Sequence, residues 1–379
     1  MSTIHKKKSA VTLEKKIAQQ QKKEQKKQEE IIKEEQEQLK KEEEKRIEEE
    51  LEHPSDPRVI NRYEQAAKVA NEALKLAKSL CKEGAVIYDI CKQVNAFIEK
   101  ECKAVFTGEF PYESGIAFPC CISVDNCCGY YSPLKEDKSV LKKGQIAKIE
   151  LAAHVSGFIA ECCDTIVIDE ASVTEEQKKI IEAGYVALQE VINKLQPGVN
   201  TNEITTLVDN VCKKYGVKAF ENIVSRNMER YMIDGHKFIL NVPSKQSIEE
   251  MNIELHDVWN LDIILSTGNC KPYDNGTKTT VFKRNIDETY ILKMRTSVQI
   301  LREINHKFPT MPFALSMLES EAKGRAGIVE IANHDLVDSY TILFEKNALV
   351  SQFKATVIVT EQGPKILTPI DAPFFYKKE

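Results

Sequence analysis

Apolar residues recur along this chain in two patterns, one typical of amphipathic helices and one typical of buried strands. A spacing of three to four residues predicts helices at about 57–81, 86–104, 174–195 and 202–215. Short runs rich in branched apolar residues predict strands at about 115–124, 146–153, 159–168, 237–241, 258–266, 340–345 and 352–360. Two helices followed by strands therefore occur twice in succession, which predicts a duplicated α+β domain.

Residues that begin or end regular structure fall at the ends of these segments. Asp56 and Pro57 form a helix start signal, because aspartate caps the first turn and proline fits the first helical position. Gly84 and Gly216 follow predicted helices, and residues 155–158 are typical of a tight hairpin turn. These positions support the predicted order of elements.

Between about 285 and 338 the pattern changes to one that is mostly helical. Its periodicity predicts helices at 290–306 and 313–324, with Pro309 and Pro312 between them. We therefore predict that residues 53–379 form one α+β domain that carries a helical insertion.

The segment 1–52 differs from the rest of the chain in composition. Residues 1–27 carry nine Lys and two Glu, whereas residues 28–52 carry five Lys or Arg and twelve Glu. Glu, Lys and Gln favour helix, but apolar residues are too sparse for a sustained heptad repeat. We predict a charged helical extension, which is either a solubilising tail or a segment whose basic end contacts nucleic acid.

The composition of the whole chain limits the classes of function. With 379 residues and 42% hydrophobic content, the chain can form one large domain or two ordinary ones. The formal net charge of −5 does not describe a polycation, and no apolar stretch is long enough to span a bilayer. The N-terminus has no apolar region typical of a secretory signal. We expect the 11 cysteines to be reduced and mostly buried rather than to bind metal.

Several motifs in order along the chain carry a resemblance to a known family. They include Gly115-Ile-Ala-Phe-Pro, Lys148-Ile-Glu-Leu, Lys278-Thr-Thr-Val-Phe-Lys-Arg and Gln352-Phe-Lys. Over about 57–375 the chain resembles the type II methionine aminopeptidases. It is more similar still to their non-enzymatic branch, the proliferation-associated proteins that include ErbB-receptor-binding proteins. The resemblance implies the duplicated pita-bread fold of these peptidases.

The resemblance also implies that a metal centre has been replaced. In the enzymes two Asp, one His and two Glu hold two divalent ions that activate water. The corresponding positions here are Glu150, Glu161, Ser225, Asp262 and Lys354. A lysine ammonium has three donors and no lone pair, so it cannot bridge two cations. No position keeps its usual ligand type, and the resemblance implies neither a bound metal nor another cofactor.

The residues that would assist the metals are also changed. Tyr130 and Ile233 stand where the resemblance implies catalytic histidines, and His236 is the alternative if the alignment there contains a short gap. His154 lies at a predicted hairpin tip, where a role in the turn is expected. The resemblance therefore implies a pseudoenzyme.

Charge gives a second view of the same positions. Glu150, Glu161 and Asp262 bring carboxylates and Lys354 brings an ammonium, so charge-assisted hydrogen bonds could hold the strands together without metal. The residual negative charge leaves open a single divalent ion or a protonated carboxylate. The alternative is that these are strand residues with no shared site, although burying such charges singly would be costly.

Basic residues gather in and near the predicted insertion. The candidates for RNA contact are Lys271, Lys278, Lys283, Arg284, Lys293, Arg295 and Arg302. Acidic residues are interleaved, so a solvated face of mixed charge is the simplest interpretation. The resemblance favours contacts with RNA phosphates, and 278–284 is the densest stretch. Few exposed aromatics are available, so we expect recognition by shape and backbone.

These observations lead to one function and two alternatives. By resemblance, the chain is an inactive aminopeptidase-like protein that binds the large ribosomal subunit through rRNA and exit-site ribosomal proteins. It would act in ribosome biogenesis or translation regulation, as a monomer in cytoplasm, nucleus and nucleolus, without membrane contact. The alternatives are a metal-dependent aminopeptidase with altered ligands and a protein-interaction scaffold that uses the former substrate cleft.

Overall fold

A computed structural model describes residues 53–105, 114–221, 223–244 and 251–377. The predicted charged helix lies in 1–52, outside the described residues. The predicted boundary at residue 52 and the bounds of the insertion stay predictions. Within the described residues, no helix combines the length and apolar character needed to cross a bilayer.

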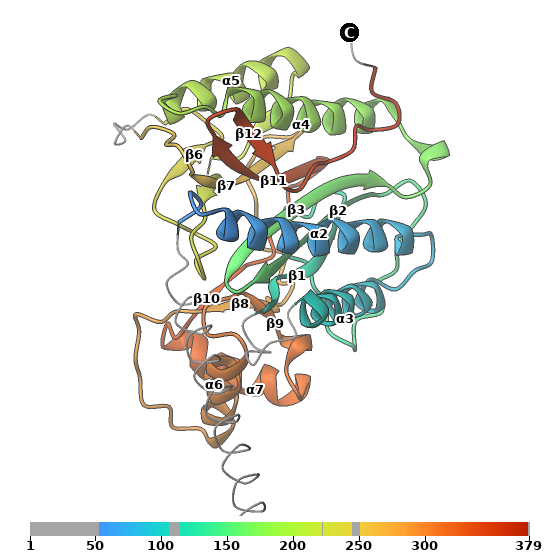
Figure 1. The fold of residues 1–379 in the computed structure, drawn as a ribbon. Helices are drawn as coiled ribbons and strands as arrows, with labels where there is room; N and C mark the ends of the chain where they lie inside the picture. The colour runs from blue at the N-terminus through green and yellow to red at the C-terminus, as the bar shows by residue number, and fades with distance from the viewer. Residues whose placement is uncertain (1–52, 106–113, 222, 245–250, 378–379) are drawn as a thin grey trace, which may run out of the picture. The chain divides into compact units, whose positions relative to one another are not determined.

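The core of the fold is an antiparallel sheet of nine strands, counted over the described residues (Figure 1). Its path runs β1-β2-β3-β11-β7-β5-β6, with β12 paired to β11 and β4 paired to β7. The strands are β1 Ser114–Val124, β2 Ile146–Val155, β3 Phe158–Val167, β4 Lys218–Ala219, β5 Val224–Asn227, β6 Phe238–Leu240, β7 Val258–Ser266, β11 Val350–Thr360 and β12 Gly363–Ile366. The sheet confirms the predicted α+β pita-bread class.

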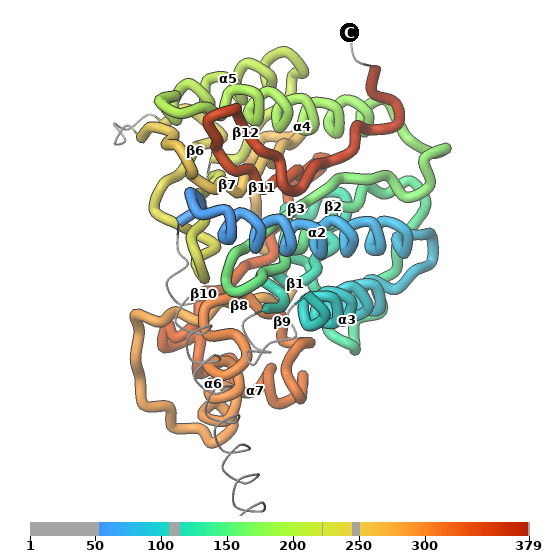
Figure 2. Tube along the Cα trace, in the orientation of Figure 1, coloured from blue at the N-terminus to red at the C-terminus, as the bar shows by residue number. Residues whose placement is uncertain are grey.

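Strands from distant parts of the sequence meet at the middle of this sheet. The strand β11 pairs with β3 on one side and with β7 on the other, so both halves of the chain share it (Figure 2). The strands β2, β7 and β11 are buried almost throughout. Any charged side chain in the middle of these strands is therefore removed from water.

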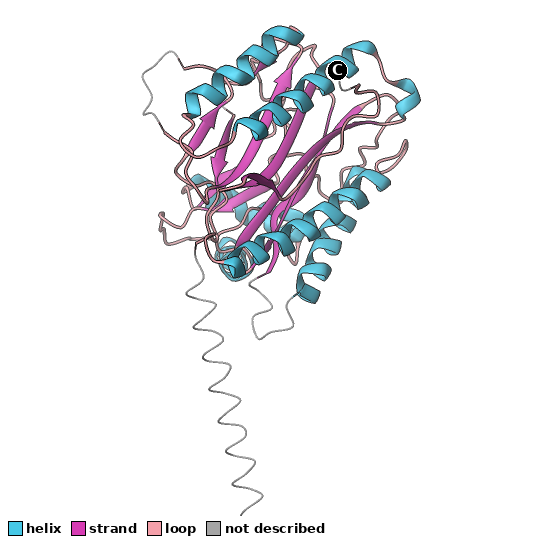
Figure 3. Cartoon of the chain, turned by 45° about the horizontal axis from the view of Figure 1, so that its top comes forward, coloured by secondary structure: helices cyan, strands magenta, loops and turns pink. Residues whose placement is uncertain are grey.

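Helices pack against the large sheet and run roughly along its strands (Figure 3). They are α2 Pro57–Leu80, α3 Ile87–Val105, α4 Glu175–Lys194 and α5 Thr201–Tyr215. The helix α2 packs on β2 and β3, α3 packs on β1, and α4 packs on β11 and β7. All four helices and the long strands lie close to their predicted positions.

Local sequence signals explain where these elements begin and turn. The side chain of Asp56 accepts a hydrogen bond from the Arg58 N–H and caps α2, with proline in the first turn. Thr174 and Gln177 form a reciprocal capping box at the start of α4. Between β2 and β3, Ser156 and Gly157 have φ values of 52° and 84°, as a tight hairpin turn requires.

A second, three-stranded sheet carries the residues near the predicted insertion. Its order is β10-β8-β9, formed by Val337–Ser339, Val281–Arg284 and Phe313–Ala314. The helices α6 (Arg295–Lys307) and α7 (Glu321–Asn333) share an apolar core with these strands. Short 3₁₀ turns occur at Glu170–Ser172 and Leu315–Met317.

Three predictions of local structure were wrong. The segment 313–324 is not one helix, because buried Phe313 pairs with β8 and Ser320 caps a helix that begins only at Glu321. Residues 290–294 are not helical, and α6 begins at Arg295.

The predicted strand at 340–345 is also absent. The strand in this region is β10, which ends at Ser339, and Phe344 makes only isolated bridges with Cys127 and Tyr273. The short strands β4, β5, β8 and β9 were not predicted, because each spans too few residues to show an alternating pattern.

Candidate functional site

Four neighbouring strands bring charged side chains together in the centre of the large sheet. Lys354 on β11 lies opposite Asp262 on β7 and opposite Cys163 on β3. Glu150 on β2 also lies opposite Cys163, and Glu161 lies two residues before Cys163 on β3. We call Glu150, Glu161, Asp262 and Lys354 the charge cluster.

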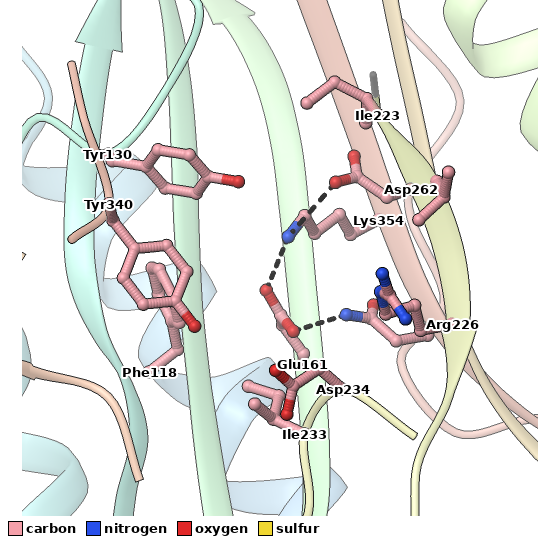
Figure 4. A pocket seen from close by; sticks show the side chains of 12 residues that line it. Phe118, Tyr130, Glu161, Ile223, Arg226, Ile233, Asp234, Asp262, Tyr340 and Lys354 are labelled. Carbon is pink, nitrogen blue, oxygen red and sulfur yellow. Dashed lines mark hydrogen bonds and ion pairs between the residues drawn. The ribbon is translucent and has the colours of Figure 1, made fainter. Parts of the chain in front are cut away.

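The ammonium of Lys354 is the centre of the charge cluster. Its Nζ lies 2.6 Å from Oε1 of Glu150, 2.7 Å from Oε1 of Glu161 and 3.3 Å from Oδ2 of Asp262. All four side chains are at most 7% exposed. Figure 4 shows Lys354 directed toward Glu161 and Asp262. The interpretation without a shared site is therefore wrong.

Amide side chains complete the hydrogen bonding of two carboxylates. Asn260 donates from Nδ2 to Oε2 of Glu161, and Gln352 donates from Nε2 to Oδ1 of Asp262 over 3.0 Å. Ser225 lies on β5, and its hydroxyl accepts a hydrogen bond of 2.8 Å from the Asp262 backbone N–H. Ser225 thus holds the β7 backbone.

Glu150 differs from the other carboxylates. Within the described residues, neither of its oxygens has a hydrogen-bond partner of good geometry, and Lys354 supplies a close ion pair to Oε1 alone. Burial raises the pKa of Glu150 to about 8, although Lys354 acts in the opposite direction. We infer that Glu150 is largely protonated at neutral pH.

The charges in the cluster keep Lys354 protonated. Burial alone would lower the pKa of Lys354, but Asp262, Glu150 and Glu161 together raise it well above its ordinary value. The group is therefore an ammonium at neutral pH. It supplies the positive charge that the buried carboxylates require.

The chemistry of this donor set does not fit a dinuclear metal centre. An ammonium already lies within hydrogen-bonding or ion-pairing distance of all three carboxylates, and lysine offers no lone pair to a metal. Among the residues that the structure describes, no group of three or more His, Cys, Asp or Glu side chains is arranged to hold a metal ion.

A cavity of about 230 Å³ opens onto the charge cluster. Tyr130 and Ile233 both line it, together with Glu161, Asp262 and Lys354 (Figure 4). The structure therefore groups both residues at the predicted histidine positions with three of the cluster residues. Their assignment to former catalytic positions stays a prediction.

Aromatic rings form one wall of this cavity. Tyr130 and Tyr340 pack edge to face with centroids 5.1 Å apart, and Phe118 lies 5.8 Å from Nζ of Lys354. Tyr130 has a φ of 64°, an uncommon conformation for a large side chain. His236 is exposed and does not line the cavity, and His154 accepts a hydrogen bond from Gly157 N–H in its hairpin turn.

The candidate RNA-contacting residues divide into two groups. Lys283 forms an ion pair of 2.6 Å with Asp234. Arg284 donates to the carbonyl of Leu336 and to Asn305, and burial lowers its pKa. The last two cations of 278–284 therefore have structural partners, and contact of this stretch with RNA stays a prediction.

The second group of candidates is exposed. It consists of Lys271, Lys278, Lys293, Arg295 and Arg302. None of these side chains forms an ion pair with another described residue. We call these five residues the exposed cations.

The described cysteines are free thiols, and all but Cys128 and Cys270 are buried.

Some residues of the site were not predicted. Asn260 and Gln352 each lie two residues before a cluster residue, so strand alternation places them on the same face as Asp262 and Lys354. Alternation alone would have found them. Tyr340 and Arg226 also line the cavity, and no pattern in the sequence indicated either.

Known proteins share this fold and much of this sequence. Metallopeptidase family M24 matches residues 61–257. Proliferation-associated protein A of Dictyostelium discoideum is 35% identical over 329 residues, covering 85% of each chain. ERBB-3 BINDING PROTEIN 1 of Solanum tuberosum is 37% identical over 327 residues, covering 85% of this chain and 84% of the relative.

Solved structures agree with the sequence relatives. A thermophilic Arx1 superposes with a TM-score of 0.78 and 26% identity, covering 84% of this chain and 92% of that chain. A methionine aminopeptidase from Thermotoga maritima superposes with a TM-score of 0.57 and 15% identity. The match covers 83% of this chain and 97% of that chain. The second likeness concerns the fold alone.

The fold and the site define a protein with the architecture of methionine aminopeptidases and a lysine–carboxylate cluster in the centre of its sheet. The chain belongs to the M24 metallopeptidase family, and within it to the group of proliferation-associated and ErbB-3-binding proteins.

Proposed function

We propose that this chain is a catalytically inactive aminopeptidase-like protein that binds the large ribosomal subunit and acts in ribosome biogenesis or translation regulation. The observation that carries the proposal is Lys354, whose ammonium lies among three buried carboxylates. A scaffold that holds an ammonium in place of metal ions does not need to preserve a catalytic centre, so we place the function of this chain on its surface.

Several features support the absence of peptidase activity. Hydrolysis in this family would need metal ions to activate water and to stabilise the oxyanion. An ammonium cannot activate water as a metal ion does, and no histidine lines the 230 Å³ cavity within the described residues. Hydrolysis of a Met-peptide by the metal-loaded protein would contradict this part of the proposal.

The surface supports contact with nucleic acid. The exposed cations are available to phosphate oxygens, because other described side chains do not neutralise them. Contacts of this kind are sequence-independent and weaken steeply as salt is added. The partners we propose are rRNA and exit-site ribosomal proteins, bound by a monomer in the cytoplasm, nucleus and nucleolus.

Sedimentation of cell lysate on sucrose gradients tests this proposal. We expect the protein to migrate with large subunits and 80S ribosomes at low salt and to leave them at high salt. A variant with Lys293, Arg295 and Arg302 changed to Ala should be released at lower salt. The matched control changes Lys68, Lys75 and Lys92, which are also exposed, and should behave as the wild type. Wild-type protein found only at the top of the gradient at both salts would contradict the proposal.

A protein-interaction scaffold is the second candidate. The cavity above the charge cluster is retained, and the relatives in Solanum tuberosum and Arabidopsis thaliana are named for binding ErbB-3. RNase treatment separates the two candidates, because a complex held by RNA is lost whereas a complex held by a peptide in the cavity persists.

A further inference from the structure

A second and larger cavity lies apart from the charge cluster. Its volume is about 640 Å³, within the range of roughly 300–1,000 Å³ of cavities that take organic ligands. It shares no lining residue with the 230 Å³ cavity. Its lining includes Tyr131, Asp137, Lys138, Lys142, Thr277 and Phe344. We call this cavity the lysine groove.

Two half-exposed aromatic rings line the lysine groove, and both are held in place. The hydroxyl of Tyr131 donates to Oδ2 of Asp137 over 2.6 Å, which fixes the ring. Phe344 is held by backbone hydrogen bonds in both directions with Tyr273, whose own side chain is 45% exposed. Such rings offer flat faces on which bases can stack.

Basic side chains line the same groove. Lys138 and Lys142 are exposed, and neither forms an ion pair with another described residue. Among the described residues, the ammonium of Lys138 donates to the carbonyl of Lys135 at 2.8 Å and to no other acceptor. Lys278, one of the exposed cations, follows the lining residue Thr277 directly.

The groove also contains one carboxylate, which is already hydrogen-bonded. Oδ1 of Asp137 accepts the Ser139 N–H over 2.8 Å, and Oδ2 accepts the Tyr131 hydroxyl. These bonds direct the carboxylate toward its own loop and leave its negative charge in place. With Lys138 and Lys142 against this one carboxylate, the lining keeps an excess of positive charge.

We propose that the lysine groove binds single-stranded RNA, with phosphates on Lys138, Lys142 and Lys278 and an unstacked base against Tyr131 or Phe344. The inference rests on the proposed function, because it specifies where RNA would be contacted. Positive charge beside aromatic faces is the combination that single strands require, whereas a duplex hides its base faces. From the sequence we expected RNA to be recognised by shape and backbone. The groove adds stacking of a base on an aromatic ring to that expectation.

Fluorescence anisotropy with a labelled oligouridylate tests the groove directly. Lys138→Ala with Lys142→Ala should weaken binding and lower the slope of log affinity against log salt by about 1.4, from roughly 0.7 per lost phosphate contact on a single strand. Phe344→Leu keeps an apolar side chain but removes the stacking face, so binding should fall about tenfold. Unchanged urea unfolding would show that each variant is folded.

The control removes the same charge from another face. Lys68→Ala with Lys75→Ala changes two exposed residues of α2, which do not line the groove, and should leave oligouridylate binding unchanged. If groove and control variants bind equally well, or if the wild type fails to bind oligouridylate at low salt, the inference is overturned.

Crosslinking distinguishes this inference from the proposed function. With 4-thiouridine in the oligonucleotide, crosslinks should map to peptides containing Tyr131 or Phe344. Crosslinks elsewhere, with normal co-sedimentation on ribosomes, would overturn the groove and leave the proposed function standing. If the groove binds oligouridylate but the protein does not co-sediment with ribosomes, the proposed function is overturned and the groove remains an RNA site.

Discussion

Lys354 and the exposed cations carry the same kind of charge in opposite environments. Lys354 is buried in the large sheet and shared by three carboxylates, whereas Lys293, Arg295 and Arg302 extend into solvent near the small sheet. A buried ammonium is fixed and contributes to folding, because removing it leaves uncompensated charge. An exposed cation contributes little to folding and remains available to a partner. The comparison therefore separates the scaffold from the binding surface.

The largest effect is expected when the buried charge is reversed. Lys354→Glu places a fourth carboxylate beside Glu150, Glu161 and Asp262, so the free energy of unfolding should fall by about 3–5 kcal/mol in EDTA. Divalent manganese should restore part of the loss, because four carboxylates provide hard oxygen ligands. Urea unfolding with and without manganese measures both effects. Equal stability of variant and wild type in EDTA would place Lys354 outside the cluster's charge balance.

A pH-dependent effect is expected from Glu150. Burial raises the pKa of Glu150 from its ordinary value near 4.5 to about 8, so the folded state holds a proton that the unfolded state has lost. Stability should therefore decrease as pH rises between these values and level off above about 8.

Glu150→Gln mimics the protonated form and removes this contribution. Near pH 5 the variant and the wild type should be similar in stability. Near pH 8.5 the variant should be more stable by more than about 1 kcal/mol, since each pKa unit corresponds to about 1.4 kcal/mol. Urea unfolding at both pH values measures the difference. A difference that is the same at both would show that Glu150 is charged throughout.

A smaller effect separates a structural arginine from an exposed one. Arg284 donates to Leu336 O over 2.9 Å and to Asn305 over 3.0 Å, so Arg284→Ala should cost about 1 kcal/mol of folding free energy. Arg302→Ala is the matched control and should change stability by less than about 0.5 kcal/mol. Ribosome binding should respond in the reverse order. A stronger loss of binding in the Arg284 variant, at full stability, would contradict the division into two groups.

The smallest effect on folding is expected when three of the exposed cations are changed together. Lys293, Arg295 and Arg302 changed to Ala should leave the unfolding free energy within about 0.5 kcal/mol. Calorimetry or urea unfolding measures this. A larger loss would mean that these side chains are part of the fold and are not free for a partner.

The sequence predicts much of the fold because its long elements carry strong local signals. The capping residues Asp56 and Thr174 and the turn at Ser156 mark the ends of long elements that the structure confirms. The short strands and the break before α7 depend on pairing with distant residues, as Phe313 does with β8, and no local pattern shows them.

The site was predictable to the extent that buried charge is unusual. Glu150 and Lys354 stand out in apolar strands, and the structure joins them at 2.6 Å. The state of Lys283 was not predictable, because its partner Asp234 is distant in sequence and only the folded chain brings them together.

Thermal unfolding of the wild-type protein in EDTA and in excess manganese tests directly whether the Lys354 ammonium takes the place of metal in the charge cluster. Because Lys354 supplies the cation that the carboxylates need, we expect the same melting temperature in both conditions. A ligand that binds the folded state at a hundred times its dissociation constant would stabilise it by about 2.7 kcal/mol. A clear rise in melting temperature with manganese, lost in Glu161→Gln, would mean that the charge cluster binds metal and that Lys354 does not take the place of a metal ion.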